Sequence, residues 1–340
     1  MNLKYNIFHK AYLRFANHPL YAWYITRLKR QYTIEKELFH FYKKTEITSN
    51  KPINNYVICT YEGHIYQGGL ADRLRGIIST YQICKQLNLQ FKLYFVHPFK
   101  LTDYLQPNKY NWEIENESVI HEIPFTKIIV LDTTQDSTYQ LKKQKQWLTK
   151  YLKEPFKQCH IYTNAAFSYQ NNYSETFNEL FKLSPRLQTA IEKQKIQIGN
   201  KYISTSFRFL NLLNDFNETF GANIKLTAQE REDLINKNLE QLHLLHQKYY
   251  EYKILVNSDS TTFLSEAKKL PFVYVNPGSI THIDNEENAT YEKFEKTFLD
   301  FFMIANADKV FLLRTGGMHK SGYPYAASLI YNKPFRIINF

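Results

Sequence analysis

Two adjacent glycines followed by arginines form the stretch best suited to chemistry. Gly68 and Gly69 come after the apolar run 56–60 and before a segment with helical spacing, which predicts strand, glycine turn and helix. Glycines let a backbone approach a ligand closely, and the N-terminus of a helix directs free N–H groups to the same place. Arg73 and Arg75 add positive charge there, so the pattern favours an anion; a turn without a ligand is the equal alternative, because neither a dinucleotide fingerprint nor a P-loop is present.

Small and charged side chains also follow the predicted strands of the second half of the chain. They are Ser206 and Arg208 after strand 201–205, Asp259 and Ser260 after strand 253–256, and Ser321 in the loop after strand 309–313. In open α/β sheets, ligands bind outside the carboxyl ends of the strands. These residues and the glycine turn are therefore predicted to line one binding cleft.

A proton acceptor is expected close to the glycine turn. Glu62, His64 and Asp72 flank it, and we favour Glu62, because a partly buried carboxylate six residues before the glycines can have a raised pKa. The alternative for each is a solvated charge or, for Asp72, an ion pair with Arg75. We name Glu62, Asp72 and Arg208 as catalytic candidates.

The elements that must position these residues alternate between strand and helix with short connections. Such alternation predicts parallel sheets covered by helices, and Ser184-Pro185 predicts the start of a helix near the point where the pattern begins again. We expect two Rossmann-like domains facing each other across a cleft. The expected boundaries are 1–50 for a basic helical extension, 51–198 and 199–330 for the two domains, and 331–340 for a tail.

Composition narrows the class of protein. The 340 residues carry a formal net charge of +11, of which the first 44 residues hold +7, from nine Lys or Arg against Glu35 and Glu37. Aromatic residues at helical spacing accompany these charges, so the segment is predicted either to lie on an anionic membrane or to pack on the body. Three widely spaced cysteines and the lack of a signal-peptide pattern or a long apolar run predict a cytoplasmic chain that does not span a membrane. His243 and His246 have no third ligand nearby, so we expect no metal.

Four pieces of sequence, in order, resemble motifs of the fucosyltransferase superfamily. Gly68-Gly69-Leu70 with Arg73 is similar to its GGLNxxR motif, and the Arg208 segment is similar to its HxR motif. The segment 257–260, with Glu266 and Ala267, resembles (T/S)DD…EA, and 300–327 resembles D-x-x-x-L…S…A. The resemblance covers roughly residues 56–330 and implies a GT-B fold.

The resemblance also implies roles for individual residues. Arg208 would hold the β-phosphate of a GDP-sugar, Asp259 would accept hydrogen bonds from guanine, and Ser260 and Ser321 would bind phosphate or ribose. The sequence departs from the family where its histidine is Ser206, its second arginine is Phe209 and the asparagine of GGLN is Ala71. Arg73 also falls one position early. These departures concern the guanine contact, the choice of acceptor and the identity of the sugar, and not the phosphate contact of Arg208.

The expected function is inverting, metal-independent transfer of fucose from GDP-fucose to a glycan or lipid-linked glycan. The protein would act in the cytoplasm, at the inner face of the membrane if the N-terminal segment binds there. The alternatives are another nucleotide-sugar GT-B glycosyltransferase, or a non-catalytic protein that binds carbohydrate or nucleic acid. Nucleic acid is disfavoured because the charge is concentrated in the first 44 residues and no RNA-binding signature is present.

Overall fold

A computed structural model describes residues 36–42, 55–123, 125–131, 138–167, 170–215, 225–281, 283 and 290–340. The basic helical extension expected within 1–50 lies outside these residues, apart from a helical segment at 36–42. Leu38 and Tyr42 of this segment are buried against Val130 and Tyr162.

Four parallel strands form the sheet of the first half of the chain, in the order β2-β1-β5-β4. They are β1 (Tyr56–Tyr61), β2 (Gln90–Phe95), β4 (Thr126–Leu131) and β5 (Gln158–Thr163). The helices α3 (Leu70–Leu87) and α4 (Thr138–Tyr151) are packed on one face of this sheet, and the segment 36–42 contacts side chains of the other. Five of the six residues of β1 are buried, as expected for a strand covered on both faces.

Five parallel strands form the second sheet, in the order β11-β10-β7-β8-β9. They are β7 (Tyr202–Phe207), β8 (Lys253–Ser258), β9 (Val273–Tyr274), β10 (Val310–Arg314) and β11 (Phe335–Asn339). The helices of this half are α7 (Ala228–Lys248), α8 (Thr261–Ala267), α9 (Tyr291–Asn306) and α10 (Tyr323–Ile330). The predicted parallel α/β architecture is therefore confirmed, whereas the domain boundaries stay predictions.

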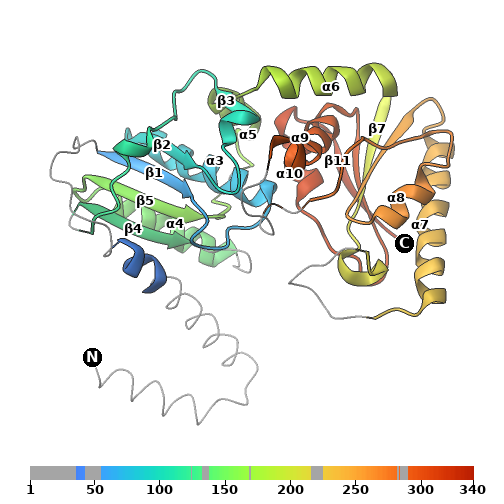
Figure 1. The fold of residues 1–340 in the computed structure, drawn as a ribbon, viewed down its shortest axis with the longest axis horizontal. Coiled ribbons are helices and arrows are strands. Elements are labelled where there is room, and N and C mark those ends of the chain that lie inside the picture. Colours follow the sequence, from blue (N-terminus) through green and yellow to red (C-terminus); the bar gives the residue numbers. More distant parts are fainter. Residues whose placement is uncertain are drawn as a thin grey trace, which may run out of the picture.

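Helix starts follow the local chemistry that the sequence indicated. Ser184 accepts a hydrogen bond from the N–H of Leu187 at the start of α6 (Pro185–Ile198), which passes from the first sheet to the second (Figure 1). At the start of α7, Thr227 and Glu230 each accept the other's backbone N–H, at 3.2 and 2.7 Å. This reciprocal capping satisfies two donors that a helix N-terminus leaves free.

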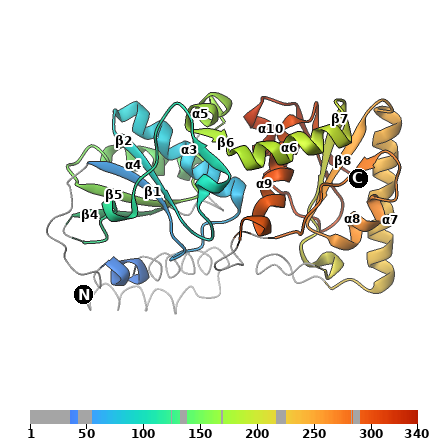
Figure 2. The ribbon, with the colours of Figure 1, turned by 45° about the horizontal axis from the view of Figure 1, so that its top comes forward.

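The two sheets share a hydrophobic core. One cluster of buried side chains includes residues of α3, β1 and β5 together with residues of α9 and α10. Figure 2 shows α9 and α10 beside the second sheet, on the side that faces the first. Hydrogen bonds across this contact include one from the Tyr104 hydroxyl to the carbonyl of Tyr291, at 2.6 Å.

The periodic pattern missed several short elements. Residues 331–340 were expected to be a tail, but Phe335–Asn339 form β11 and pair in parallel with β10. Strands β3 (Leu105–Pro107) and β6 (Phe181–Leu183) pair with each other, and α5 (Tyr173–Leu180) precedes β6. Such short segments are stabilised by distant partners, so local periodicity carries little signal for them.

Within the described ranges, no helix combines the length and the apolar character that crossing a bilayer requires.

Candidate functional site

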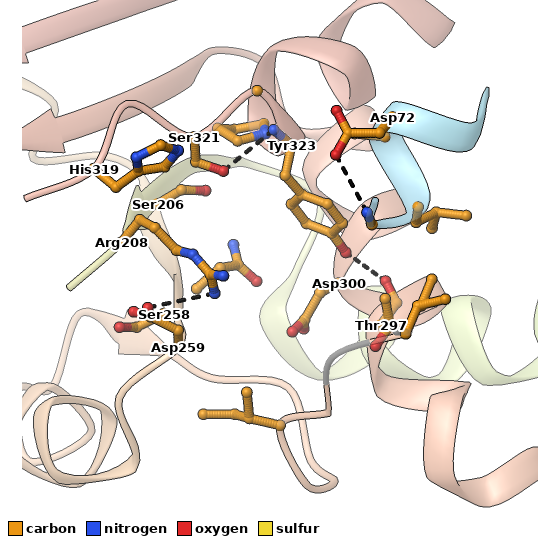
Figure 3. Close-up of a pocket in the computed structure, with 18 of the residues that line it drawn as sticks. Asp72, Ser206, Arg208, Ser258, Asp259, Thr297, Asp300, His319, Ser321 and Tyr323 are labelled. Atoms are coloured by element: carbon orange, nitrogen blue, oxygen red, sulfur yellow. Dashed lines mark hydrogen bonds and ion pairs between the residues drawn. The ribbon is translucent and has the colours of Figure 1, made fainter. Parts of the chain in front are cut away.

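Residues from both halves of the chain line a cavity of about 820 Å³. The first half contributes the glycine turn and the first residues of α3. The second half contributes the carboxyl ends of β7 and β8, the loop after β10 and parts of α9 and α10. Figure 3 shows Arg208 and Asp259 at one side of this cavity and Asp72 at another.

Arg208 is held at the cavity by Asp259, and the two lie 3.4 Å apart (Nη1 to Oδ2). They come from adjacent strands, since Arg208 follows β7 and Asp259 follows β8. The Asp259 oxygens also accept the backbone N–H groups of Phe209 and Leu210, at 2.8 and 2.7 Å. Leu210 has a positive φ of 55°, so the carboxylate also fixes a backbone turn that leucine rarely adopts.

The Asp259 side chain is only 1% exposed, and that of Arg208 is 18% exposed. Burial raises the pKa of Asp259, while Arg208 and the two N–H groups act in the opposite direction. Both carboxylate oxygens are already engaged within the protein. Asp259 is thus placed to orient Arg208 and the turn after it, and little of its surface is open to a ligand.

Two polar atoms at the base of the cavity have no partner within the described structure. Ser206 and Asn257 are paired in register on β7 and β8, and each is 6% exposed. The Asn257 amide donates to the hydroxyl of Ser204, but its Oδ1 and the Oγ of Ser206 accept or donate no hydrogen bond. Buried polar atoms are nearly always hydrogen-bonded, so this pair has unused capacity that a ligand could take up.

The loop between β10 and α10 is held against Arg208. The His319 N–H donates to the Arg208 carbonyl at 2.8 Å, and the Arg314 side chain donates to the Met318 carbonyl at 2.9 and 3.2 Å. Partial burial, together with Arg208 and Arg314, lowers the pKa of His319. The exposed Lys320 also lines the cavity, so this loop adds one cationic side chain to the side where Arg208 lies.

The N-terminus of α10 opens onto the same cavity. Its cap, Gly322, provides no side-chain hydrogen bond, and the Ser321 hydroxyl accepts the N–H of Tyr323 at 3.3 Å. Tyr323 already donates its N–H to Ser321, and Pro324 has none, so the positive end of the helix dipole is what favours an anion at this helix start. Ser321 therefore lies just before the N-terminus of α10 and lines the cavity, where the sequence predicted it.

The glycine turn reaches the cavity in the predicted way. Gly68 has a φ of +76°, and a Cβ at this position would lie 2.6 Å from the Asp72 Oδ2. The Gly69 N–H donates to that same oxygen at 3.2 Å, while the other oxygen pairs with Arg75 at 3.0 Å. Asp72 is 36% exposed and lines the cavity together with both glycines and Arg75.

Arg73 has a different place from the one expected, since it is not among the residues that line the cavity. It is 3% exposed, and it donates to the carbonyls of Gly68 and His97 at 2.9 and 2.8 Å. Its guanidinium also lies over the rings of Tyr61 and Phe95. Its position on α3 turns it towards the sheet, so Arg73 supports the glycine turn from behind and Arg75 is the arginine that reaches the cavity.

The placement of Glu62 contradicts its assignment as the catalytic base. Its side chain is 6% exposed and is not part of the cavity lining. One oxygen accepts the hydroxyl of Tyr162, and the other lies 2.9 Å from His121 Nε2. The loop after β1 turns Glu62 to the face of the sheet opposite α3, where the His64 ring also contacts the ring of Phe41 at an interplanar angle of 40°.

The hydrogen bonds of Glu62 belong to a longer buried row. Tyr162 contacts the hydroxyl of Tyr42 at 2.9 Å, and Tyr42 contacts His160 Nδ1 at 2.5 Å. His160 Nε2 in turn lies 3.0 Å from the amide oxygen of Gln158. Burial lowers the pKa of His160 and raises that of Tyr162. The row joins helical segment 36–42 to the first sheet.

Ser260 also differs from the expected phosphate contact. It is fully buried, outside the cavity lining, and caps α8 by accepting the N–H of Phe263. Its hydroxyl donates to Asp215 at 2.7 Å, and the same Asp215 oxygen accepts the N–H of Thr262 at 2.8 Å. Burial alone raises the pKa of Asp215, but these hydrogen bonds outweigh it and hold the pKa below its ordinary value. Ser258, two residues earlier, lines the cavity instead.

A buried ion pair on α9 lines the cavity, and sequence reasoning assigned it no role. Lys296 Nζ lies 3.0 Å from the Asp300 Oδ2, and both residues are at most 9% exposed. The backbone carbonyl of Asn276 accepts a hydrogen bond from Lys296, and the side-chain amide of Asn276 donates one to Asp300. Two signals were present: Asp300 begins the segment that resembles D-x-x-x-L…S…A, and Lys296 precedes it by four residues, a spacing that brings two side chains together on a helix.

Groups suited to a metal ion are absent from the described part of the chain, where no three His, Cys, Asp or Glu residues cluster to hold one. His243 and His246 both pack against the ring of Phe272.

Comparison with known proteins bears on the fold. No family model matches the sequence, and no curated protein is similar to it at a significant level. Among solved structures, the NodZ α-1,6-fucosyltransferase soaked with GDP-fucose is 14% identical, with a TM-score of 0.53 over 84% of this chain and 95% of that one. NodZ from Bradyrhizobium, in a selenomethionine form, has the same identity and TM-score over 85% and 95%.

A mutant of FUT1 from Arabidopsis thaliana, in complex with GDP, is 9% identical, with a TM-score of 0.50 over 90% of this chain and 74% of that one. At these identities the likeness concerns the fold. The chain has a fucosyltransferase-like α/β fold, which confirms the resemblance seen in the sequence.

Proposed function

We propose that this protein is a glycosyltransferase that transfers fucose from GDP-fucose. The observation that carries the proposal is Arg208, which Asp259 fixes at the carboxyl end of β7, beside unpartnered polar atoms and a helix N-terminus in one cavity. The fold supports it, because structures with this fold were determined with GDP-fucose or GDP. A cavity of about 820 Å³ also has the size of typical small-molecule sites.

The diphosphate is assigned to the cationic side of the cavity. Arg208 presents a planar guanidinium suited to a bidentate phosphate contact. Lys320, Ser321 and the positive dipole end of α10 lie on the same loop and helix start, where they can bind the second phosphate. As the bond between sugar and phosphate breaks, these groups would stabilise the charge that develops on the leaving GDP.

The remainder of the donor is assigned to the base of the cavity. The guanine contact expected for Asp259 is hard to reconcile with its 1% exposure and its two backbone N–H partners. We assign to the unpartnered Ser206 Oγ and Asn257 Oδ1 the hydrogen bonds to the donor's polar groups. Asp259 then acts through Arg208 as a positioning residue.

Asp72 is the proposed proton acceptor, because among the three acceptors predicted near the glycine turn it alone lines the cavity. In an inverting transfer, the acceptor hydroxyl attacks the anomeric carbon while the bond from that carbon to the phosphate oxygen breaks. The hydroxyl proton passes to Asp72, and GDP leaves with the bonding electron pair. Gly69 and Arg75 orient the carboxylate for this step.

The acceptor is proposed to be a glycan or a lipid-linked glycan, reached in the cytoplasm at the inner face of a membrane. The charge of +7 in the first 44 residues motivates this location. A variant without residues 1–44 that folds and still fractionates with membranes to the same extent would contradict a role for that segment.

The donor assignment is tested by calorimetry with GDP, UDP, ADP and CMP, and by release of GDP from GDP-fucose. We expect selective binding of GDP, which Arg208→Ala abolishes. Arg336→Ala, which removes an exposed arginine on β11, is the matched control and should bind like the wild type. Selective binding of UDP would indicate another nucleotide-sugar donor, and binding of none of the four would refute the transferase assignment.

A further inference from the structure

Helix α4 forms a basic surface at the outer side of the first sheet, far along the chain from the N-terminal charges. Residues 138–153 contain five lysines and no Asp or Glu. They are Lys142, Lys143, Lys145, Lys150 and Lys153. All five are exposed or partly exposed, whereas Leu148 and Leu152 of the same segment are buried in the core. The core contacts hold the helix in one orientation, so its lysines point away from the sheet.

An exposed aromatic pair borders these lysines. Trp147 is 48% exposed and is stacked on Tyr151, with ring centroids 5.1 Å apart. Lys127, on the edge strand β4, lies 4.4 Å from the Tyr151 ring. Tryptophan and tyrosine at the border of a basic surface are typical of proteins that sit in the headgroup region of a bilayer, because their rings have an apolar body and a polar edge.

We propose that this surface, made of the five lysines with Trp147 and named here the α4 surface, binds membranes rich in anionic phospholipid. Charge complementarity carries the proposal, since residues 138–153 hold five lysines and no carboxylate, which matches a negatively charged plane; the adjacent Glu154 pairs with Lys127, at 3.4 Å. The inference concerns a surface outside the donor cavity, so it does not depend on which sugar is transferred.

The shape of the surface favours a membrane over single-stranded nucleic acid. Proteins that bind single strands combine a basic groove with aromatic faces on which bases stack. The α4 surface lies along one convex helix, and Tyr151 already covers one face of the Trp147 ring. A flat layer of headgroups can contact all the exposed lysines of such a helix at once.

The experiment compares full-length variants in flotation with vesicles. The test variant replaces Lys142, Lys145 and Lys150 with Gln. The control carries the same change of charge at exposed lysines of α6, α7 and the end of α8: Lys193→Gln, Lys248→Gln and Lys268→Gln. Vesicles of phosphatidylcholine alone are compared with vesicles containing phosphatidylglycerol.

We expect the wild type and the control to bind the anionic vesicles, and both to bind phosphatidylcholine weakly. One lysine near an anionic surface changes partitioning roughly fivefold, so the test variant should lose on the order of 100-fold. The effect should shrink as salt is raised. Equal unfolding midpoints in urea would show that the test and control variants are equally folded.

Fluorescence gives a second readout at the surface itself. The emission of Trp147, isolated as the difference between the wild type and Trp147→Phe, should shift to shorter wavelength on anionic vesicles only. Equal binding of test and control variants, equal binding to both vesicle types, or an unshifted Trp147 emission would overturn the proposal. So would tighter binding of an oligonucleotide that depends on the same three lysines.

Discussion

Replacing Asp259 with Asn tests whether this carboxylate organises the donor site. In the native protein, its two oxygens accept the N–H groups of Phe209 and Leu210 and face the Arg208 guanidinium at 3.4 Å. Asparagine preserves the shape of the side chain but has one acceptor oxygen in place of two. Its NH₂ group must then face a backbone N–H or the guanidinium. Both of these are hydrogen-bond donors, so the NH₂ group, itself a donor, leaves them without an acceptor.

The expected loss of stability can be worked from these contacts. A buried N–H left without an acceptor costs about 1–3 kcal/mol. Removing the partner of a buried charge costs about 3–5 kcal/mol, but Arg208 borders a cavity, and its 18% exposure allows water to replace much of that interaction. We therefore expect the free energy of unfolding to fall by about 2–4 kcal/mol in total. The variant should also bind GDP more weakly, because Arg208 is no longer held in one orientation.

Urea unfolding at neutral pH measures the effect. Glu251→Gln is the matched control, since it removes one carboxylate from the exposed pair with Lys201 and should leave the unfolding midpoint unchanged. A loss of less than about 1 kcal/mol in Asp259→Asn would show that the carboxylate does not hold the turn. Normal stability with normal GDP affinity would refute the positioning role altogether.

Three further predictions concern protons and support of the glycine turn. The negative charge of a bound diphosphate should raise the lowered pKa of His319, so GDP binding near pH 6 should take up protons. Calorimetry in buffers of different ionisation enthalpy measures this uptake, and His319→Gln should remove it. Arg73→Met should lower the free energy of unfolding by about 2–4 kcal/mol, because two buried carbonyls lose their donor, while the folded fraction in urea titrations still binds GDP within about threefold. Because the pKa of Asp215 is lowered on folding, this carboxylate adds stability that is complete above pH 3.8 and is lost as the pH falls through the folded-state pKa. The free energy of unfolding of Asp215→Asn should therefore depend less steeply on pH in that range. An unchanged dependence in acid unfolding would contradict this role of Asp215.

The sequence predicted the fold where hydrophobic periodicity is strong. Strands such as 56–60 and 253–256 and the helix that starts at Pro185 were found within two residues of their predicted bounds. Strand 335–339 was missed because its stability depends on pairing with β10, a partner that local pattern does not reveal. The predicted parallel α/β architecture and the predicted fucosyltransferase-like fold are both confirmed.

The candidate site was predicted less completely, because spacing along a chain does not tell which way a side chain points. Gly69, Asp72 and Arg208 line the cavity as expected. Arg73 is one residue from Asp72, yet its place on α3 turns it into the core, and Glu62 is turned to the opposite face of the sheet. Such directions depend on the exact ends of strands and helices, which are the least predictable features of a sequence.

The number of available protons decides how many hydrogen bonds the buried row from His160 to Glu62 can form. Three contacts join His160, Tyr42, Tyr162 and Glu62. The Gln158 oxygen faces His160 Nε2, so a neutral His160 holds its proton there, and with Glu62 ionised the two tyrosines supply only two protons for the three contacts. One added proton completes the row in either of two directions, carried by the carboxyl at one end or by the imidazole at the other. The hydrogen bonds by which Tyr42 attaches helical segment 36–42 to the sheet therefore all point one way along the row, and the position of one proton decides which way.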